Sequence, residues 1–179
     1  DLLDPDDPEV ARRRVGLLTR VAVVEAHAGD ARHTATVREA GRAALDVGDL
    51  DAAVEALTTS VRFAITTGND PDPVKVELLE EGLTQVGDGD VVTRARLLAS
   101  LGLELIFTGE FDRRGPVLDE LYELLLDFPD PVQRGLMAAT LGSHHLGSDW
   151  NEETARLRVA WIEAGLPHVT DPFTEATLV

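Results

Sequence analysis

A two-residue link between two helical patterns constrains this chain more than any other feature. Hydrophobic and small residues recur at helical spacing from Val37, and Gly48-Asp49 ends that pattern just before a second stripe begins at Leu50. Because so short a link leaves no slack, the two helices must fold back on each other as a hairpin. The two stripes comprise Val37, Ala40, Gly41, Ala44 and Leu45, then Leu50, Ala53, Val54, Leu57 and Val61.

The same spacing occurs a second time, with each position 61 residues after its counterpart. Both copies contain a hydrophobic residue, a glycine, a Gly-acidic turn and a further hydrophobic residue two positions later, which indicates an internal repeat. The second set is Leu98, Leu101, Gly102, Leu105, Gly109, Phe111 and Leu118, and it matches Val37, Ala40, Gly41, Ala44, Gly48, Leu50 and Leu57.

This spacing resembles the tetratricopeptide repeat, a helix-turn-helix unit of about 34 residues. Ala40-Gly41 and Leu101-Gly102 match the small-residue step of its first helix, and Ala53 matches the small residue of its second. Arg114 departs from that pattern, and the terminal proline is absent from both copies. The resemblance therefore implies a degenerate array: an all-α, right-handed superhelical solenoid of antiparallel helix hairpins, with about eight or nine helices.

Turn and capping signals divide the chain into helices within a single helical-repeat domain. Residues 1–7 are an irregular lead-in, 8–67 hold the first three helices, 72–128 the middle helices and 131–179 the C-terminal helices. The pairs Asp7-Pro8 and Asp72-Pro73 are typical of a helix start, with an N-cap followed by proline. Sustained period-two alternation is absent, so no sheet is expected. Both ends lie in acidic, proline-containing sequence, which suggests a fragment of a longer protein.

Several finer predictions concern individual helices. In the first helix, an apolar stripe is expected to face inward. That stripe is Val10, Leu17, Val21 and Val24. The third helix is expected to end near Thr67 and the seventh near His145, and Asp171-Pro172 would start a ninth. Gly115-Pro116 either kinks the sixth helix or marks its true beginning at the proline.

Composition excludes several classes of function. The net charge of −17 repels nucleic-acid phosphates and anionic membranes, so neither is an expected partner. The absence of cysteine excludes disulfides and thiolate sites, and it fits a reducing cytoplasm. No apolar run reaches the length of a membrane span. Lys75 is the single lysine among 16 basic residues, a bias that indicates a high-GC bacterial source or, alternatively, salt adaptation.

A broader likeness involves three stretches: Arg94 to Leu105, Gly109 to Arg114, and His144 to Trp150. Together they resemble the helical-repeat region of large bacterial signalling ATPases and of LuxR- and MalT-type transcription regulators. The resemblance implies a non-catalytic protein-interaction segment of a larger cytoplasmic regulator. A solenoid domain that senses a small effector is the alternative, and an enzyme is the third hypothesis. Lys75 has no glycine-rich loop before it, so no Walker-type nucleotide site is expected in this chain.

Candidate sites are few, and each has a plainer structural interpretation beside it. A contact site is expected in the loop that joins the seventh and eighth helices, where Trp150 alternatively only fills a gap between helices. The residues of that candidate site are His144, His145, Asp149 and Trp150. The cluster Arg12-Arg13-Arg14 either pairs with acidic groups on a neighbouring element or forms a solvated helix face.

Metal and catalytic sites have weaker support in the sequence. His27 and His33 flank a turn, where they either meet to bind a metal or lie on the surface, and no third ligand is implied. The Asp pair in Gly87-Asp88-Gly89-Asp90 does not match a calcium loop, so a solvated turn is expected. No carboxylate is expected to stand alone in apolar sequence with a raised pKa. We therefore expect no catalytic residue, metal or cofactor.

Overall fold

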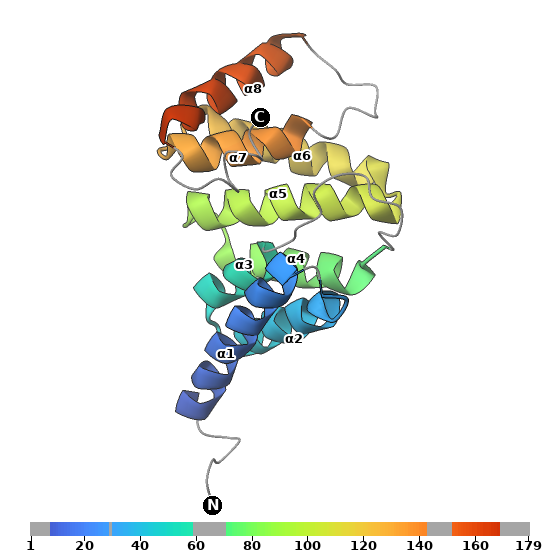
Figure 1. The fold of residues 1–179 in the computed structure, drawn as a ribbon. Coiled ribbons are helices and arrows are strands. Elements are labelled where there is room, and N and C mark those ends of the chain that lie inside the picture. The colour runs from blue at the N-terminus through green and yellow to red at the C-terminus, as the bar shows by residue number, and fades with distance from the viewer. Residues whose placement is uncertain (1–7, 29, 59–70, 143–151, 169–179) are drawn as a thin grey trace, which may run out of the picture.

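The computed structural model describes residues 8–28, 30–58, 71–142 and 152–168 of the chain (Figure 1). These residues form eight α-helices and one short 3-10 helix, with no strand among them. The all-α prediction is therefore confirmed over the described ranges. The elements are α1 (Pro8–Ala28), α2 (His33–Asp46), α3 (Leu50–Thr58), α4 (Pro73–Val86), α5 (Val91–Thr108), α6 (Phe111–Leu126), α7 (Pro131–Gly142), α8 (Glu152–Gly165) and η1 (Leu166–His168).

Aspartate side chains start two central helices, as the sequence predicts for the first of them. At α4, the Asp72 carboxylate accepts a hydrogen bond from the Lys75 backbone N–H at 2.9 Å. At α5, Asp90 accepts from the backbone N–H groups of Val92 and Thr93, both at 3.1 Å. These bonds satisfy amide groups that have no partner inside the helix, so they stabilise both helix starts.

The first copy of the repeated pattern has the predicted stripe on its buried side. The buried residues of α2 are Val37, Ala40, Gly41, Ala44 and Leu45. Gly48, in the turn before α3, has φ of 70°, a left-handed backbone that glycine adopts without strain. A Cβ placed on Gly41 would lie 2.6 Å from Leu57 Cδ2, so α2 and α3 approach too closely for any larger residue.

The second copy reproduces these contacts at the equivalent positions. Gly109, after α5, has φ of 75°. A Cβ on Gly102 would lie 2.8 Å from Leu118 Cδ2 on α6. Arg114 replaces the small residue of the first copy; it is buried, and its Nε donates to the Gly102 carbonyl oxygen at 3.1 Å. The arginine is therefore accommodated by a hydrogen bond where the first copy has only Ala53.

The helices succeed one another in space in the order of the chain. Each α-helix contacts the next, and further contacts join α1 to α3, α2 to α4, α3 to α5 and α5 to α7. In Figure 1, α1 and α2 lie at one end of the molecule, and α7 and α8 lie at the other. Central α5 contributes to two hydrophobic clusters: Leu97, Leu101 and Leu105 pack with α1–α4, whereas Ala95, Leu98 and Ala99 pack with α6–α8.

The predicted inward face of α1 is wrong. Leu17, Val21 and Val24 are 58%, 46% and 65% exposed, and Val10 is only half-buried. Among the described side chains of α1, the buried positions are Val15, Thr19, Ala22 and Glu25. His33 Nδ1 lies 3.3 Å from the Ala22 carbonyl oxygen, so α1 meets α2 on this side. The face of α1 that packs inward therefore depends on its contacts with neighbouring helices, which hydrophobic periodicity does not measure.

Helix α6 decides between the two predictions made for Gly115-Pro116. Helix α6 begins at Phe111 and continues through Pro116, so the proline does not mark its start. Gly115 has no Cβ, so the part of the usual steric clash before proline that involves Cβ is absent here. The predicted ends near Thr67 and His145 and the predicted ninth helix lie outside the described residues. Among the described helices, none combines the length and apolar character needed to cross a membrane.

Candidate functional site: an acidic hollow at the helix ends

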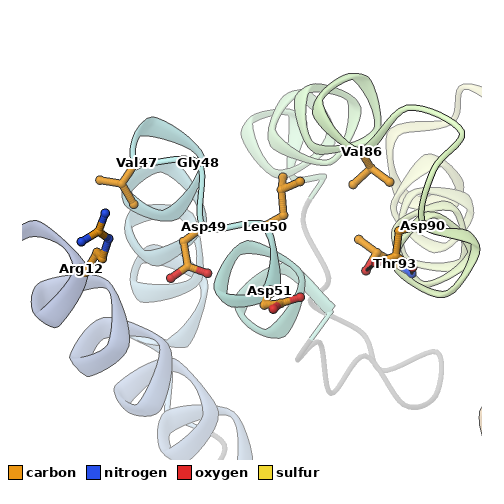
Figure 2. Close-up of a pocket in the computed structure, with 9 residues that line it drawn as sticks. All are labelled: Arg12, Val47, Gly48, Asp49, Leu50, Asp51, Val86, Asp90 and Thr93. Atoms are coloured by element: carbon orange, nitrogen blue, oxygen red, sulfur yellow. Dashed lines mark hydrogen bonds between the residues drawn. The ribbon is translucent and has the colours of Figure 1, made fainter. Parts of the chain in front are cut away.

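A hollow of about 480 Å³ lies where the start of α1, the α2–α3 turn, the end of α4 and the start of α5 come together (Figure 2). The short turn after α2 positions Asp49, Leu50 and Asp51, and the Asp90 cap positions Thr93 at the start of α5. The complete lining is Arg12, Val47, Gly48, Asp49, Leu50, Asp51, Val86, Asp90 and Thr93. We refer to this feature as the acidic hollow.

Three carboxylates and one guanidinium dominate the charge of the acidic hollow. Asp51 and Asp90 are exposed and Asp49 is half-buried, while Arg12 is the only basic residue in the lining. The Thr93 hydroxyl donates to Asp90 at 2.7 Å and lowers the pKa of that carboxyl, and the backbone N–H groups of Thr93 and Val92 lower it further. Asp90 is therefore charged at neutral pH, and the hollow favours a cationic group.

The walls between these charges are apolar. Figure 2 shows Leu50 of α3 and Val86 of α4 on facing sides of the hollow, with Val47 beside Arg12. Lysine and arginine side chains have the matching character, because an aliphatic stem carries a cationic head. Asp49 also accepts from the Ala52 backbone N–H at 3.1 Å, so two of the three carboxylates already bind helix-start amides. In chemical terms the arrangement is suited to a cationic ligand.

A separate chain of buried polar groups links α2, α4 and α5. Arg38 Nε donates to the Asp72 carboxylate at 2.9 and 3.1 Å, and Asp72 is 2% exposed. One helical turn further, Lys75 Nζ lies 2.9 Å from Glu104 Oε1, and the two side chains are 4% and 0% exposed. Neither Lys75 nor Glu104 lines the acidic hollow. The pair joins two helices in the interior, and we assign it a structural role.

The sequence analysis overlooked one carboxylate that stands in an apolar stretch, Glu104. This residue lies between Leu103 and Leu105 in an apolar stretch, and it is fully buried. The sequence did contain a usable signal, because Lys75 shares a helical face with Val76 and Leu79. A charge on the apolar face of each of two helices indicates a pair, since an isolated buried charge costs too much.

Comparisons with protein-family models, with curated proteins and with solved structures find no match to this chain. The resemblance to tetratricopeptide repeats and to bacterial regulators therefore stays a prediction. The candidate contact site of His144, His145, Asp149 and Trp150 lies outside the described residues. The described residues instead form the acidic hollow, whose members the sequence indicates only as turn residues, a stripe position and part of a basic cluster.

The remaining candidates from the sequence are the histidine pair, the glycine-rich loop and the arginine cluster. His33 is half-buried near the Ala22 carbonyl, and the side chain of His27 is not among those described. In the described part of the chain, no three His, Asp or Glu side chains gather into a metal site. Asp90 of the glycine-rich loop caps α5, and the exposed Arg14 pairs with Glu39 of α2 at 2.7 Å. One arginine of the basic cluster therefore pairs with an acidic residue of a neighbouring helix, as one of the two alternatives predicts.

Proposed function

We propose that this chain is a non-catalytic protein-interaction scaffold, built as a right-handed solenoid of helix hairpins, whose acidic hollow binds a basic segment of its partner. The acidic hollow is the observation that carries the proposal. It sets three carboxylates and one guanidinium around apolar walls near the ends of five helices, α1 to α5. The successive packing of α1 to α8, with contacts to the next helix but one, supports a solenoid, because helical repeats touch mainly their neighbours.

The scaffold acts, in this proposal, within a larger cytoplasmic regulator of transcription or signalling in a bacterium. The resemblance drawn from the sequence supports that context. The lining of the hollow comes partly from α1–α3 and partly from α4–α5. A partner bound in the hollow would therefore influence how these two groups of helices pack on each other. Such coupling is what a segment between sensor and output parts needs.

A matched pair of charge variants tests the hollow. Asp51→Asn removes one carboxylate from the lining, and Asp119→Asn removes an exposed carboxylate on α6, so both variants change the net charge equally. A fluorescent oligoarginine peptide serves as the probe, and its affinity is measured by anisotropy at physiological salt. Asp51→Asn should weaken binding up to about fivefold, because one partly exposed ion pair is worth up to about 1 kcal/mol. Equal effects of the two variants would refute a specific hollow.

A small cationic effector is the second candidate ligand. The hollow has a volume of about 480 Å³, which lies within the usual range of small-molecule sites. An aliphatic diamine would place its ammonium groups near the carboxylates and its methylene groups against Leu50 and Val86. A rise in melting temperature with the diamine, abolished by Asp51→Asn, together with no specific peptide binding, would favour the effector over the protein partner.

A further inference from the structure

Helix α1 has a second apolar face that points away from the rest of the molecule. We define the outer face of α1 as Leu17, Val21 and Val24, which are 58%, 46% and 65% exposed. Their spacing of four and three residues aligns them as one stripe along the helix. Single exposed hydrophobic residues are ordinary, whereas three aligned in one stripe make a candidate contact surface.

The outer face lies opposite the side by which α1 is packed. Val15, Thr19 and Ala22 are buried, and at 100° per residue they fall on the other side of the helix from the outer face. α1 contacts α2 and α3. A helix whose exposed side is apolar is suited to contact with a further neighbour on that side. The terminal elements of helical arrays instead have polar outer sides, which keep them soluble.

The charge around the outer face is opposite to that of the rest of the chain. Helix α1 contains four arginines and two glutamates, hence a formal charge of +2 in a chain of −17. Arg13 and Arg20 are exposed and share one flank of the outer face, since they lie four residues before and three after Leu17. A partner surface that complements this flank must therefore be acidic.

We propose that the outer face of α1 binds an amphipathic helix of a partner protein, whose apolar stripe is flanked by Asp or Glu. The apolar stripe would pack on Leu17, Val21 and Val24, and the acidic flank would pair with Arg13 and Arg20. A second copy of α1 fits less well. A symmetric pairing sets the same patch against itself, so the basic flanks would oppose each other. This surface is distinct from the acidic hollow and takes a ligand of the opposite charge.

Two synthetic helical peptides with one shared apolar stripe provide the direct test. In one peptide the flanking positions are Glu, and in the other they are Lys; each is titrated into the full chain and followed by calorimetry. The Glu peptide should bind, and Leu17→Ser should weaken it about tenfold, because much of one leucine surface is no longer buried. Val159→Ser, at a 51% exposed position on α8, is the matched control and should leave binding unchanged.

A second pair of variants tests the charge. Arg20→Gln should weaken the Glu peptide by roughly twofold to fivefold, whereas Arg156→Gln, with the same charge change at an exposed position on α8, should have little effect. A dominant effect of Arg156→Gln would overturn the assignment to the outer face. Equal binding of the Glu and Lys peptides would also overturn it. So would a dimer in sedimentation that Leu17→Ser abolishes, because the face would then belong to a second copy. Equal effects of Asp51→Asn and Asp119→Asn on oligoarginine binding would refute the acidic hollow, but they would not change the results expected at the outer face.

Discussion

The close approach at Gly41 leads to a quantitative prediction about stability. A Cβ at this position would lie 2.6 Å from Leu57 Cδ2 and 3.0 Å from Cγ, and Leu57 is fully buried, so it has no free space to move into. Overpacking of this kind costs about 1–3 kcal/mol. Alanine at the same time favours the helix over glycine by about 1 kcal/mol. Because 2.6 Å is far below any normal separation, we expect Gly41→Ala to lower the free energy of unfolding by about 1–2 kcal/mol.

Gly16 in α1 is the matched control for that substitution. It is also helical, and a Cβ there would meet nothing within 4 Å. Gly16→Ala should therefore raise the free energy of unfolding by about 0.5–1 kcal/mol. Gly102→Ala should fall between the two, because Leu118 is only half-buried and can yield. Urea denaturation followed by far-UV circular dichroism measures all three. If Gly41→Ala stabilises the chain as much as Gly16→Ala, the close-packing argument is refuted.

Three further predictions concern charged groups. Glu104→Leu alone should cost about 3–5 kcal/mol of stability because it strands the buried Lys75 ammonium, whereas the double variant with Lys75→Met should recover most of the loss in urea denaturation. Asp90→Ala should cost about 1 kcal/mol through loss of the α5 cap, and a cost near zero would contradict the capping role. The Arg32 side chain and the Arg32 backbone N–H lower the pKa of Asp30 from 3.8 to about 2. The stabilisation that the Asp30 carboxylate contributes is therefore complete above pH 3.8 and is lost as the pH falls toward about 2. The difference in melting temperature between the wild type and Asp30→Asn should therefore shrink below about pH 3.8, and a difference that persists there would disprove the assignment.

Local patterns in the sequence predicted much of the helical structure. The stripe of α2, the turn at Gly48 and the Asp72-Pro73 start of α4 all appear where the sequence indicates them. These features depend on residues within one or two helical turns of each other. Hydrogen bonds, caps and backbone preferences act over that distance, so one short stretch contains the information.

The acidic hollow could not be predicted in the same way. Its lining comes from residues near 12, 50 and 90 of the chain, and each stretch by itself reads as an ordinary helix or turn. The sequence shows the acidic or apolar character of each residue, but it does not show that these residues lie close together in the folded chain. The Asp90 cap was missed for another reason. Gly87-Asp88-Gly89-Asp90 has the composition of a solvated turn, and that interpretation does not consider the helix that starts directly after it.

The amino-acid sequence alone determined which segments of this protein are helical, where glycine turns separate them, and that its surface is strongly acidic. The tertiary structure decided which of two apolar stripes of α1 packs inward, that Lys75 meets Glu104, and that carboxylates from separate turns surround one hollow. The physical reason is the distance along the chain between the residues that interact. Helix formation depends on interactions between residues three or four apart, whereas burial and ion pairing depend on close packing between residues that are distant along the chain.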